Sequence, residues 1–378
     1  MYRQFISLFC GAFLFFALMV GALVFVIDPL HYIRVPWYLN HIDYPERFKA
    51  PALAKSHTYD TVIIGSSMTK NFHPSFIDKK FGGKTIKLCM AGSTPREQLM
   101  ILQLAIASGQ LKRVIWSLDT SSYKVPCSEV RYDQGPFPFY LYENSFLSKL
   151  KYLYNYDFVR DSVVLLATIS DLKNSFSVEQ YEHYLDELHC FHNKKEFSFD
   201  GKIAMNAMQE LLTPKNEQQF MSFIGKYHLT NVLAKQEQFQ HTLDFYKREI
   251  IPVLKKQSKV EFYFFSPPYS IAYHKIHHVC NEAGYLQLLE LKRNLYAELI
   301  KLDNVKLFDF QDVASITHNL NGYKDLTHYS HRTNEYIIES FATNQHLVDR
   351  RSPTVSIDRL EQQVYETTFA NICLALTP

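Results

Sequence analysis

Two short segments, far apart in the chain, contain the residue types of a serine nucleophile and its base. The run TVIIGSSMTKN (residues 61–71) ends an apolar, β-branched stretch in a glycine and two serines, Ser66 and Ser67. Near the C-terminus, the run YKDLTHYS places Asp325 three residues before His328. A serine hydroxyl needs a base to lose its proton at neutral pH, and an imidazole base needs a carboxylate to orient it. The sequence therefore predicts a Ser67–His328–Asp325 triad.

Acyl chemistry at a serine also needs donors for the negative charge that develops on the attacked oxygen. Two backbone amides are placed for this task at the starts of predicted helices, where the helix dipole favours an anion. They belong to Ser67 and to Gly92, which lies in the run KLCMAGSTPRE. Gly92 has no side chain, so its backbone can approach an acyl group closely. We expect these two amides to form an oxyanion site.

The elements that must position these residues alternate along the chain. Apolar, β-branched or aromatic runs predict strands over 60–66, 85–90, 113–119, 259–266 and 305–310. Start and stop signals predict helices over 71–83, 93–109, 232–256 and 281–302, and from about residue 331. Thr94, Pro95 and Glu97 form a capping-box pattern at the start of the second helix. This alternation predicts an α/β fold with a parallel sheet, in which sites form at the carboxyl ends of the strands.

The alternation stops after the third strand. Residues from 120 to about 230 are more than a crossover needs, and we expect them to form a mostly helical insertion. The predicted organisation is an anchor over 1–28, one α/β domain over 29–350 that contains the insertion, and a polar tail over 351–378.

Within the insertion, residues 136–158 are unusually aromatic. The simpler interpretation is a helical lid that packs its rings on the sheet edge. The alternative is a platform for sugar rings or for the membrane surface, with Tyr140 and Tyr142 as contact residues.

The first segment is long and apolar enough to cross a membrane. Residues 5–27 contain no charged residue, and these 23 residues span roughly 34 Å as a helix. A cleaved signal peptide has a shorter apolar region and a small-residue exit site, and neither is found before Asp28. We therefore expect an uncleaved single-span anchor. Positive residues lie on both sides, Arg3 before and Arg34 after, so charge alone does not fix the orientation.

Composition argues against several classes of protein. A formal net charge of +2 is far from the basic excess of a nucleic-acid binder. Five cysteines lie outside the apolar segment, with no paired spacing that predicts a disulfide framework or a metal site. The groups His189–His192, with His183 nearby, and His274–Cys280 contain zinc-binding residue types but also lack paired spacing. We expect neither a metal nor a cofactor.

The motifs VIIGSSMT, KLCMAGSTPRE, YFFSPPYS and YKDLTHYS together resemble the SGNH (GDSL-like) hydrolase superfamily, over roughly residues 60–345 without most of the insertion. They look like a membrane-anchored branch related to the D-alanyl transfer protein of lipoteichoic acid synthesis and to polysaccharide O-acyltransferases. The resemblance implies a flavodoxin-like sheet. It also implies that Ser67 is the nucleophile, that Gly92 is an oxyanion donor, and that Asp325 and His328 complete the triad.

The same resemblance implies a location and partners. The soluble domain is expected outside the cytoplasm, at a bacterial cytoplasmic membrane, as a serine esterase or O-acyltransferase of the cell envelope. Its expected substrates are an acyl donor and an envelope polysaccharide or related glycan. The implied partner is a membrane-embedded acyltransferase that brings acyl groups across the bilayer.

Two departures from the family pattern leave the chemistry open. Ser66 replaces the acid that usually precedes the nucleophile. The third block normally offers an asparagine donor, whereas here the strand ends in Asp119, and Ser121 or an insertion side chain is the candidate replacement. Losing one oxyanion donor typically costs about 10²–10³ in rate. The alternative hypothesis is therefore a non-catalytic anchored binding or assembly subunit. A phosphate-binding module is less favoured, because GSS lacks a glycine-rich loop and a basic partner.

Overall fold

The chain folds around a five-stranded parallel sheet. The computed structural model describes residues 2–40, 42–119, 126–133, 135–174, 177–188, 190, 200–213, 216–227, 229 and 236–368. The strands are β1 (Thr61–Ile64), β2 (Thr85–Lys87), β3 (Arg113–Ser117), β4 (Glu261–Ser266) and β5 (Val305–Asp309). Their order is β2-β1-β3-β4-β5, with every neighbouring pair parallel. This is the order of flavodoxin-like doubly wound sheets. The predicted parallel α/β sheet is confirmed.

Helices cover both faces of the sheet, which is why the strands are largely apolar and their charged residues lie mostly at the strand ends. On one face, α3 (Pro74–Phe81) lies against α15 (His331–Thr343), whose Phe341 ring is 4.6 Å from that of Phe308. On the other face, Gln98 of α4 (Pro95–Ile106) accepts a hydrogen bond from the Trp116 indole at 2.7 Å. Tyr296 of α13 (Glu282–Leu299) bonds Ser266 on this second face at 2.7 Å. Packed against α13 is α10 (Gln236–Phe245), which continues through a π-helical turn (Tyr246–Ile250) into α11 (Ile251–Lys256).

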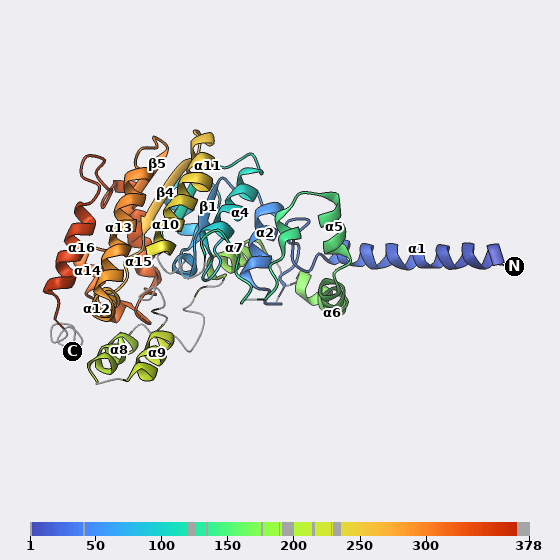
Figure 1. Ribbon diagram of the computed structural model, residues 1–378. Helices are drawn as coiled ribbons and strands as arrows, with labels where there is room; N and C mark the ends of the chain where they lie inside the picture. The colour runs from blue at the N-terminus through green and yellow to red at the C-terminus, as the bar shows by residue number, and fades with distance from the viewer. Residues whose placement is uncertain are drawn as a thin grey trace.

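Between β3 and β4 the described chain is largely helical. Before α10, its described helices are a 3₁₀ turn (Phe139–Tyr142), α5 (Phe146–Leu153), α6 (Tyr156–Asn174), α7 (Val178–Glu187), α8 (Lys202–Leu212) and α9 (Glu217–Lys226). Figure 1 shows α5 and α6 beside the base of α1, whereas α8 and α9 lie together far from it. Within this part, α8 also contacts α12 (Ile271–Cys280) of the α/β body.

The helix α1 (Tyr2–Ile27) projects from the body as a long single element (Figure 1). Among the described helices it is the one that is long and apolar enough to cross a membrane. Most of its side chains are exposed, and only Gly21, Val24 and Ile27 near its end are buried. This burial pattern is typical of a helix attached to the domain only at its last turns.

The structure differs from the sequence predictions at three helices. One is α2 (Glu46–Ser56), which contains Pro51 in its interior, and the second is α12, which begins after a cap at Ser270. The third, α16 (Val355–Glu366), lies in the segment predicted as a polar tail and buries only a narrow stripe of side chains: Ile357, Leu360 and Val364. Short connecting helices follow β5, namely α14 (Ala314–Thr317) and a 3₁₀ turn (Leu320–Gly322).

Candidate active site

The predicted site residues lie where the sheet topology favours a site. From β1 the chain passes to β2 on one side and then to β3 on the other, so the strand order reverses between β1 and β3. Ligands of open α/β sheets bind outside the carboxyl ends of the strands at such a switch point. Ser66 and Ser67 directly follow β1, and Asp119 follows β3 at this edge.

Ser67 begins a 3₁₀ turn, η1 (Ser67–Thr69), immediately after the strand. Ser66 is the N-cap of this turn, with its hydroxyl accepting from the amide of Met68 at 3.4 Å. Gly65 makes the sharp exit from the strand possible, because a Cβ there would lie 2.2 Å from the Ser117 hydroxyl. Ser66 is fully buried, whereas Ser67 is partly exposed. The exposed hydroxyl is therefore the one that the sequence assigns as nucleophile.

The structure brings the three predicted triad residues together. The Oγ of Ser67 lies 2.8 Å from Nε2 of His328, although 261 positions separate them in the chain. Nδ1 of the same ring lies 2.7 Å from Oδ2 of Asp325. The His328 and Asp325 side chains are 21% and 27% exposed, so a substrate has access to the group. Both distances are within the range required for proton transfer through the imidazole.

The loop that contains Asp325 and His328 is fixed to the other strand ends. An antiparallel bridge between Tyr323 and Tyr329 closes the loop. The hydroxyl of Tyr323 donates to the carbonyl of Pro268 after β4, at 2.7 Å. The carbonyl of Tyr329 accepts from the amide side chain of Asn71 after β1, at 3.2 Å. These contacts hold the His328 ring within hydrogen-bond distance of Ser67.

The Asp325 carboxylate is stabilised in its ionised form. Burial by itself raises the pKa of this carboxyl. The charge of His328 and the hydrogen bonds that the carboxylate accepts outweigh burial and lower the pKa well below its ordinary value. Its Oδ1 accepts from the amides of Thr327 and His328 at 2.9 and 2.8 Å. The other oxygen is left for the imidazole, which is thereby held with its proton on Nδ1 and its Nε2 free to act as a base.

The Gly92 turn lies at the same edge of the sheet as Ser67. The amide of Met90 donates to the carbonyl of Gly65 at 3.0 Å, and the hydroxyl of Ser93 approaches the same carbonyl at 3.2 Å. Gly92 has a φ of +58°, a left-handed conformation that favours glycine. Within the described residues, the amides of Ser67 and Gly92 donate to no acceptor. Both amides therefore have the capacity to bind an oxyanion.

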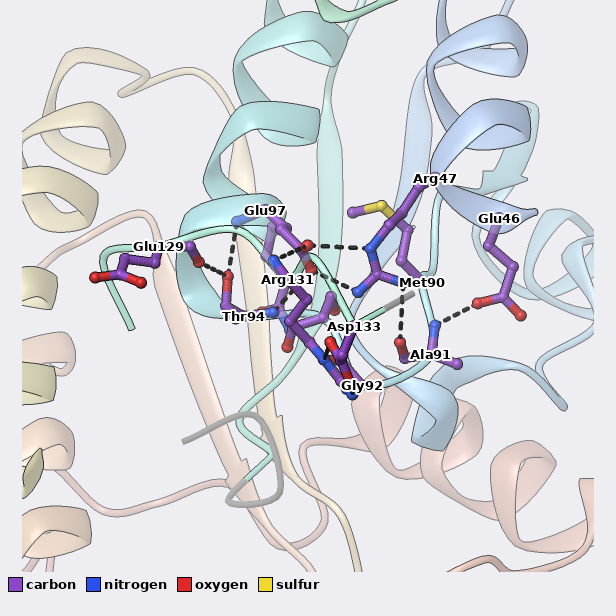
Figure 2. Close-up of polar contacts among 12 residues, drawn as sticks. Glu46, Arg47, Met90, Ala91, Gly92, Thr94, Glu97, Glu129, Arg131 and Asp133 are labelled. Atoms are coloured by element: carbon purple, nitrogen blue, oxygen red, sulfur yellow. Dashed lines mark hydrogen bonds and ion pairs between the residues drawn. The ribbon is translucent and has the colours of Figure 1, made fainter. Parts of the chain in front are cut away.

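A buried ion-pair network supports this turn from behind (Figure 2). Glu97, fully buried in the first turn of α4, forms the predicted capping box with Thr94. The same carboxylate accepts two bonds from the Arg47 guanidinium, at 3.0 and 2.8 Å, and one from the amide of Arg131 at 2.9 Å. The Arg131 guanidinium in turn donates to the carbonyl of Gly92 at 2.9 Å. Sequence analysis found the cap but not its two arginine partners, which come from distant segments.

Sequence reasoning also missed a buried cluster below the nucleophile. Asp119, at the end of β3, is only 2% exposed, and its carboxylate accepts hydrogen bonds from the hydroxyls of Ser66 and Tyr269. The position of Tyr269 directly after β4, in the run SPPYS, was the available signal. In both of these contacts Asp119 is the acceptor, whereas the absent asparagine would act as a donor. Ser121, the candidate replacement, lies outside the described residues.

The remaining sequence candidates do not join this site. Within the described ranges, no group of three or more histidine, cysteine, aspartate or glutamate side chains is arranged to hold a metal ion. His189 and His192 lie outside those ranges. The Tyr142 hydroxyl donates to the carbonyl of Arg47 at 3.0 Å, and its ring stacks on Phe137, so Tyr142 packs inside the protein.

No protein-family model matches the chain, and no curated protein matches it. The functional interpretation therefore depends on the residues of the site and their geometry.

Proposed function

We propose that the protein is a membrane-anchored serine esterase or O-acyltransferase of SGNH type. The observation that supports this most strongly is the Ser67–His328–Asp325 arrangement, with hydrogen-bond distances of 2.8 and 2.7 Å at the carboxyl edge of a parallel sheet. A partly exposed serine hydroxyl, an imidazole and an ionised carboxylate in this order are the parts of a serine nucleophile system.

In the proposed reaction, the Ser67 oxygen attacks the carbonyl carbon of an acyl ester while its proton passes to Nε2 of His328. Asp325 stabilises the imidazolium that forms. The amides of Ser67 and Gly92 donate to the oxyanion of the tetrahedral intermediate. His328 then protonates the leaving oxygen, which gives an acyl-enzyme and an alcohol. A hydroxyl of a glycan, or water, then attacks the acyl carbon while its proton passes to His328. The bond between the acyl group and the Ser67 oxygen breaks, and His328 returns the proton to that oxygen.

Within the described residues, the site has two amide donors and no asparagine at the end of β3. A missing oxyanion donor typically costs about 10²–10³ in rate. This loss slows transfer and hydrolysis alike, so the choice between a glycan hydroxyl and water depends on how well the site excludes water and not on the rate.

The apolar helix α1 supports anchoring of the domain at a membrane. The family resemblance is the basis for proposing that this is a bacterial cytoplasmic membrane and that the site lies outside the cytoplasm. An acyl donor and an envelope polysaccharide or related glycan are the proposed substrates. A membrane-embedded acyltransferase that supplies the acyl group is the proposed partner.

The first experiment is labelling of the detergent-solubilised full chain with a fluorescent fluorophosphonate, which reacts with activated serines. We expect one label, located on Ser67 by mass spectrometry, and no label after Ser67→Ala or His328→Ala. Carbonate extraction of the membranes tests the anchor separately. A folded protein that takes no label would contradict the enzymatic proposal and favour the non-catalytic anchored subunit.

A further inference from the structure

A cavity of about 530 Å³ lies between the end of α1 and the helices α2, α4 and α5. Its lining includes residues from the segments before β1 and β3, such as Tyr59 and Ser108. Those segments lie at the amino ends of the strands, whereas Ser67 follows the carboxyl end of β1. The cavity is therefore separate from the candidate active site, and its volume falls in the range of small-molecule sites.

The cavity is apolar with a cationic part. Phe25, Leu104, Leu150 and Leu153 contribute apolar side chains, and Lys55 and Lys149 are the charged residues that line it. Among its described lining residues there is no carboxylate. An apolar wall with two cations that form no ion pair in the described residues is complementary to an anionic amphiphile.

The described residues place no carboxylate within ion-pair distance of either lysine, although the Glu143 carboxylate is near enough to act on the charge of Lys55. The ammonium of Lys55 donates to the hydroxyl of Tyr32 and to the backbone carbonyl of Glu143, both uncharged groups, so one of its three donors remains. Lys149 has no hydrogen-bond or ion-pair partner in the described part of the chain. Burial lowers the pKa of Lys55 to about 8, the nearby charge of Lys149 adds to this effect, and the charge of the Glu143 carboxylate opposes it. An anion between these two cations would relieve their mutual repulsion.

The depth of the cavity relative to a bilayer follows from the contacts of α1. The hydroxyl of Tyr154, at the end of α5, donates to the carbonyl of Ala17 at 3.1 Å. If the domain lay wholly outside the bilayer, only the part of α1 before Ala17 could cross it. That part is about 22 Å long, which is less than the roughly 30 Å of a hydrocarbon core. The turn between α5 and α6 must therefore enter the membrane interface.

Exposed side chains of α5 and α6 agree with this depth. Phe146, Leu147 and Tyr156 are 73%, 68% and 77% exposed, and tyrosine is a usual residue of the interface. The charged residues in this turn, Asp157 and Arg160, are paired at 3.2 Å. Phe25, which lines the cavity, lies two residues before the end of α1, and this places the mouth of the cavity near the level of the lipid headgroups.

We propose that this cavity binds one anionic phospholipid, with its phosphate between Lys55 and Lys149 and an acyl chain against Phe25, Leu150 and Leu153. The bound lipid would fix the α/β domain at a defined height and orientation on the membrane. The proposal rests on the proposed membrane anchor of α1 and is independent of the serine chemistry.

Native mass spectrometry of the detergent-solubilised full chain tests this site with equal amounts of phosphatidylglycerol and phosphatidylcholine. We expect the wild-type protein to retain one phosphatidylglycerol with at least tenfold preference. Lys149→Gln should lower that preference about tenfold. Lys151→Gln is the matched control, because Lys151 lies on the same exposed helix but does not line the cavity, and it should leave binding unchanged. Millimolar inorganic phosphate should not displace the lipid, because phosphate has no apolar part.

Three outcomes would overturn the proposal: equal retention of the two lipids, equal effects of Lys149→Gln and Lys151→Gln, or displacement of the lipid by inorganic phosphate. An unfolding temperature equal to that of the wild-type protein, measured in the same detergent, shows that each variant is folded. Release of the protein from membranes by carbonate would contradict the proposed anchoring by α1. Failure of the lipid site, failure of the anchor and failure of the serine chemistry are thus three separate results.

Discussion

At the scale of single residues, the candidate site depends on contacts between parts of the chain that are far apart. Residue types and their places at strand ends were enough to predict Ser67, Asp325 and His328. The sequence does not show that Tyr323 and Tyr329 fix the loop, since their partners lie in other segments. It also does not show why position 65 is glycine, because the reason is the hydroxyl of Ser117 on a neighbouring strand.

We expect Asp325→Asn to lower the second-order rate of fluorophosphonate labelling about 10³–10⁴-fold. The amide nitrogen of asparagine donates where the carboxylate accepted, which favours the histidine tautomer with its proton on Nε2. That nitrogen then no longer accepts the proton of Ser67. The remaining amide oxygen still accepts from the Thr327 and His328 amides, so the loop should stay folded. Labelling within threefold of the wild-type rate would contradict this role.

The two adjacent serines give a second test. Ser66→Ala removes one donor to the buried Asp119 carboxylate and leaves the Ser67 hydroxyl in place. We expect this variant to lose about 1–3 kcal/mol of stability, because a buried carboxyl group loses a hydrogen-bond partner, yet to keep its label. Ser67→Ala should lose the label and keep its stability. Thermal unfolding and labelling of both variants measure the two effects, and a label that disappears with Ser66 would reverse the assignment.

At the scale of elements, prediction succeeded where local chemistry determines structure. Buried β-branched and aromatic runs identified the five strands, and the Thr94–Glu97 capping box was confirmed in detail. It failed where packing overrides local signals. Pro51 is accommodated inside α2, and α16 forms from a mostly polar segment because one narrow apolar stripe packs on α12 and α13. A burial stripe of three residues is too weak a signal without its partner helices.

The turn before α4 carries a prediction about backbone conformation. In Gly92→Ala, the added Cβ would lie 2.1 Å from the end of the Arg131 side chain, so the guanidinium must move away and lose its bond to the Gly92 carbonyl. The left-handed φ of +58° also strains alanine, so the turn loses support at its amide. We expect labelling to slow at least tenfold, because the Gly92 amide is a proposed oxyanion donor. Gly109→Ala, at the other end of α4, is the control: its φ is also positive, +75°, but nothing lies within 4 Å of the added Cβ. Equal slowing in both variants would exclude a specific role for the Gly92 turn.

At the scale of the whole molecule, the two proposed functions occupy opposite edges of one sheet. The nucleophile lies at the carboxyl ends of the strands, and the cavity beside α1 lies near their amino ends. The sheet is a rigid, doubly covered layer between them, so a domain fixed at the membrane through the cavity would present Ser67 at a constant position. No local pattern in the sequence predicts this separation, since it depends on how helices from distant segments assemble around α1.

The pH dependence of stability is also a property of the whole molecule, because it depends on buried groups in different elements. Burial lowers the pKa of His57 to about 4 and lowers that of His274 well below its ordinary value near 6.5. Below pH 6.5 the unfolded chain therefore binds protons that the folded protein does not. Each of these histidines should lower the free energy of unfolding by up to about 1.4 kcal/mol per pH unit as the pH falls from 6.5 toward 4. Asp325, with its lowered pKa, contributes stability throughout this window and loses it only in stronger acid.

We therefore expect the unfolding temperature of the full chain in detergent to fall between pH 7.5 and pH 5. His57→Gln should reduce the fall, because the glutamine amide binds no proton in either state. The variant should also be less stable at pH 7.5, since the wild-type ring bonds the hydroxyls of Ser56 and Tyr181 at 2.8 and 2.6 Å. The quantity to compare is the difference between the unfolding temperatures at pH 7.5 and pH 5, measured for each protein. This difference does not contain the loss of stability that the variant shows at both pH values. An equal fall in wild type and variant would show that His57 is not buried as a neutral ring.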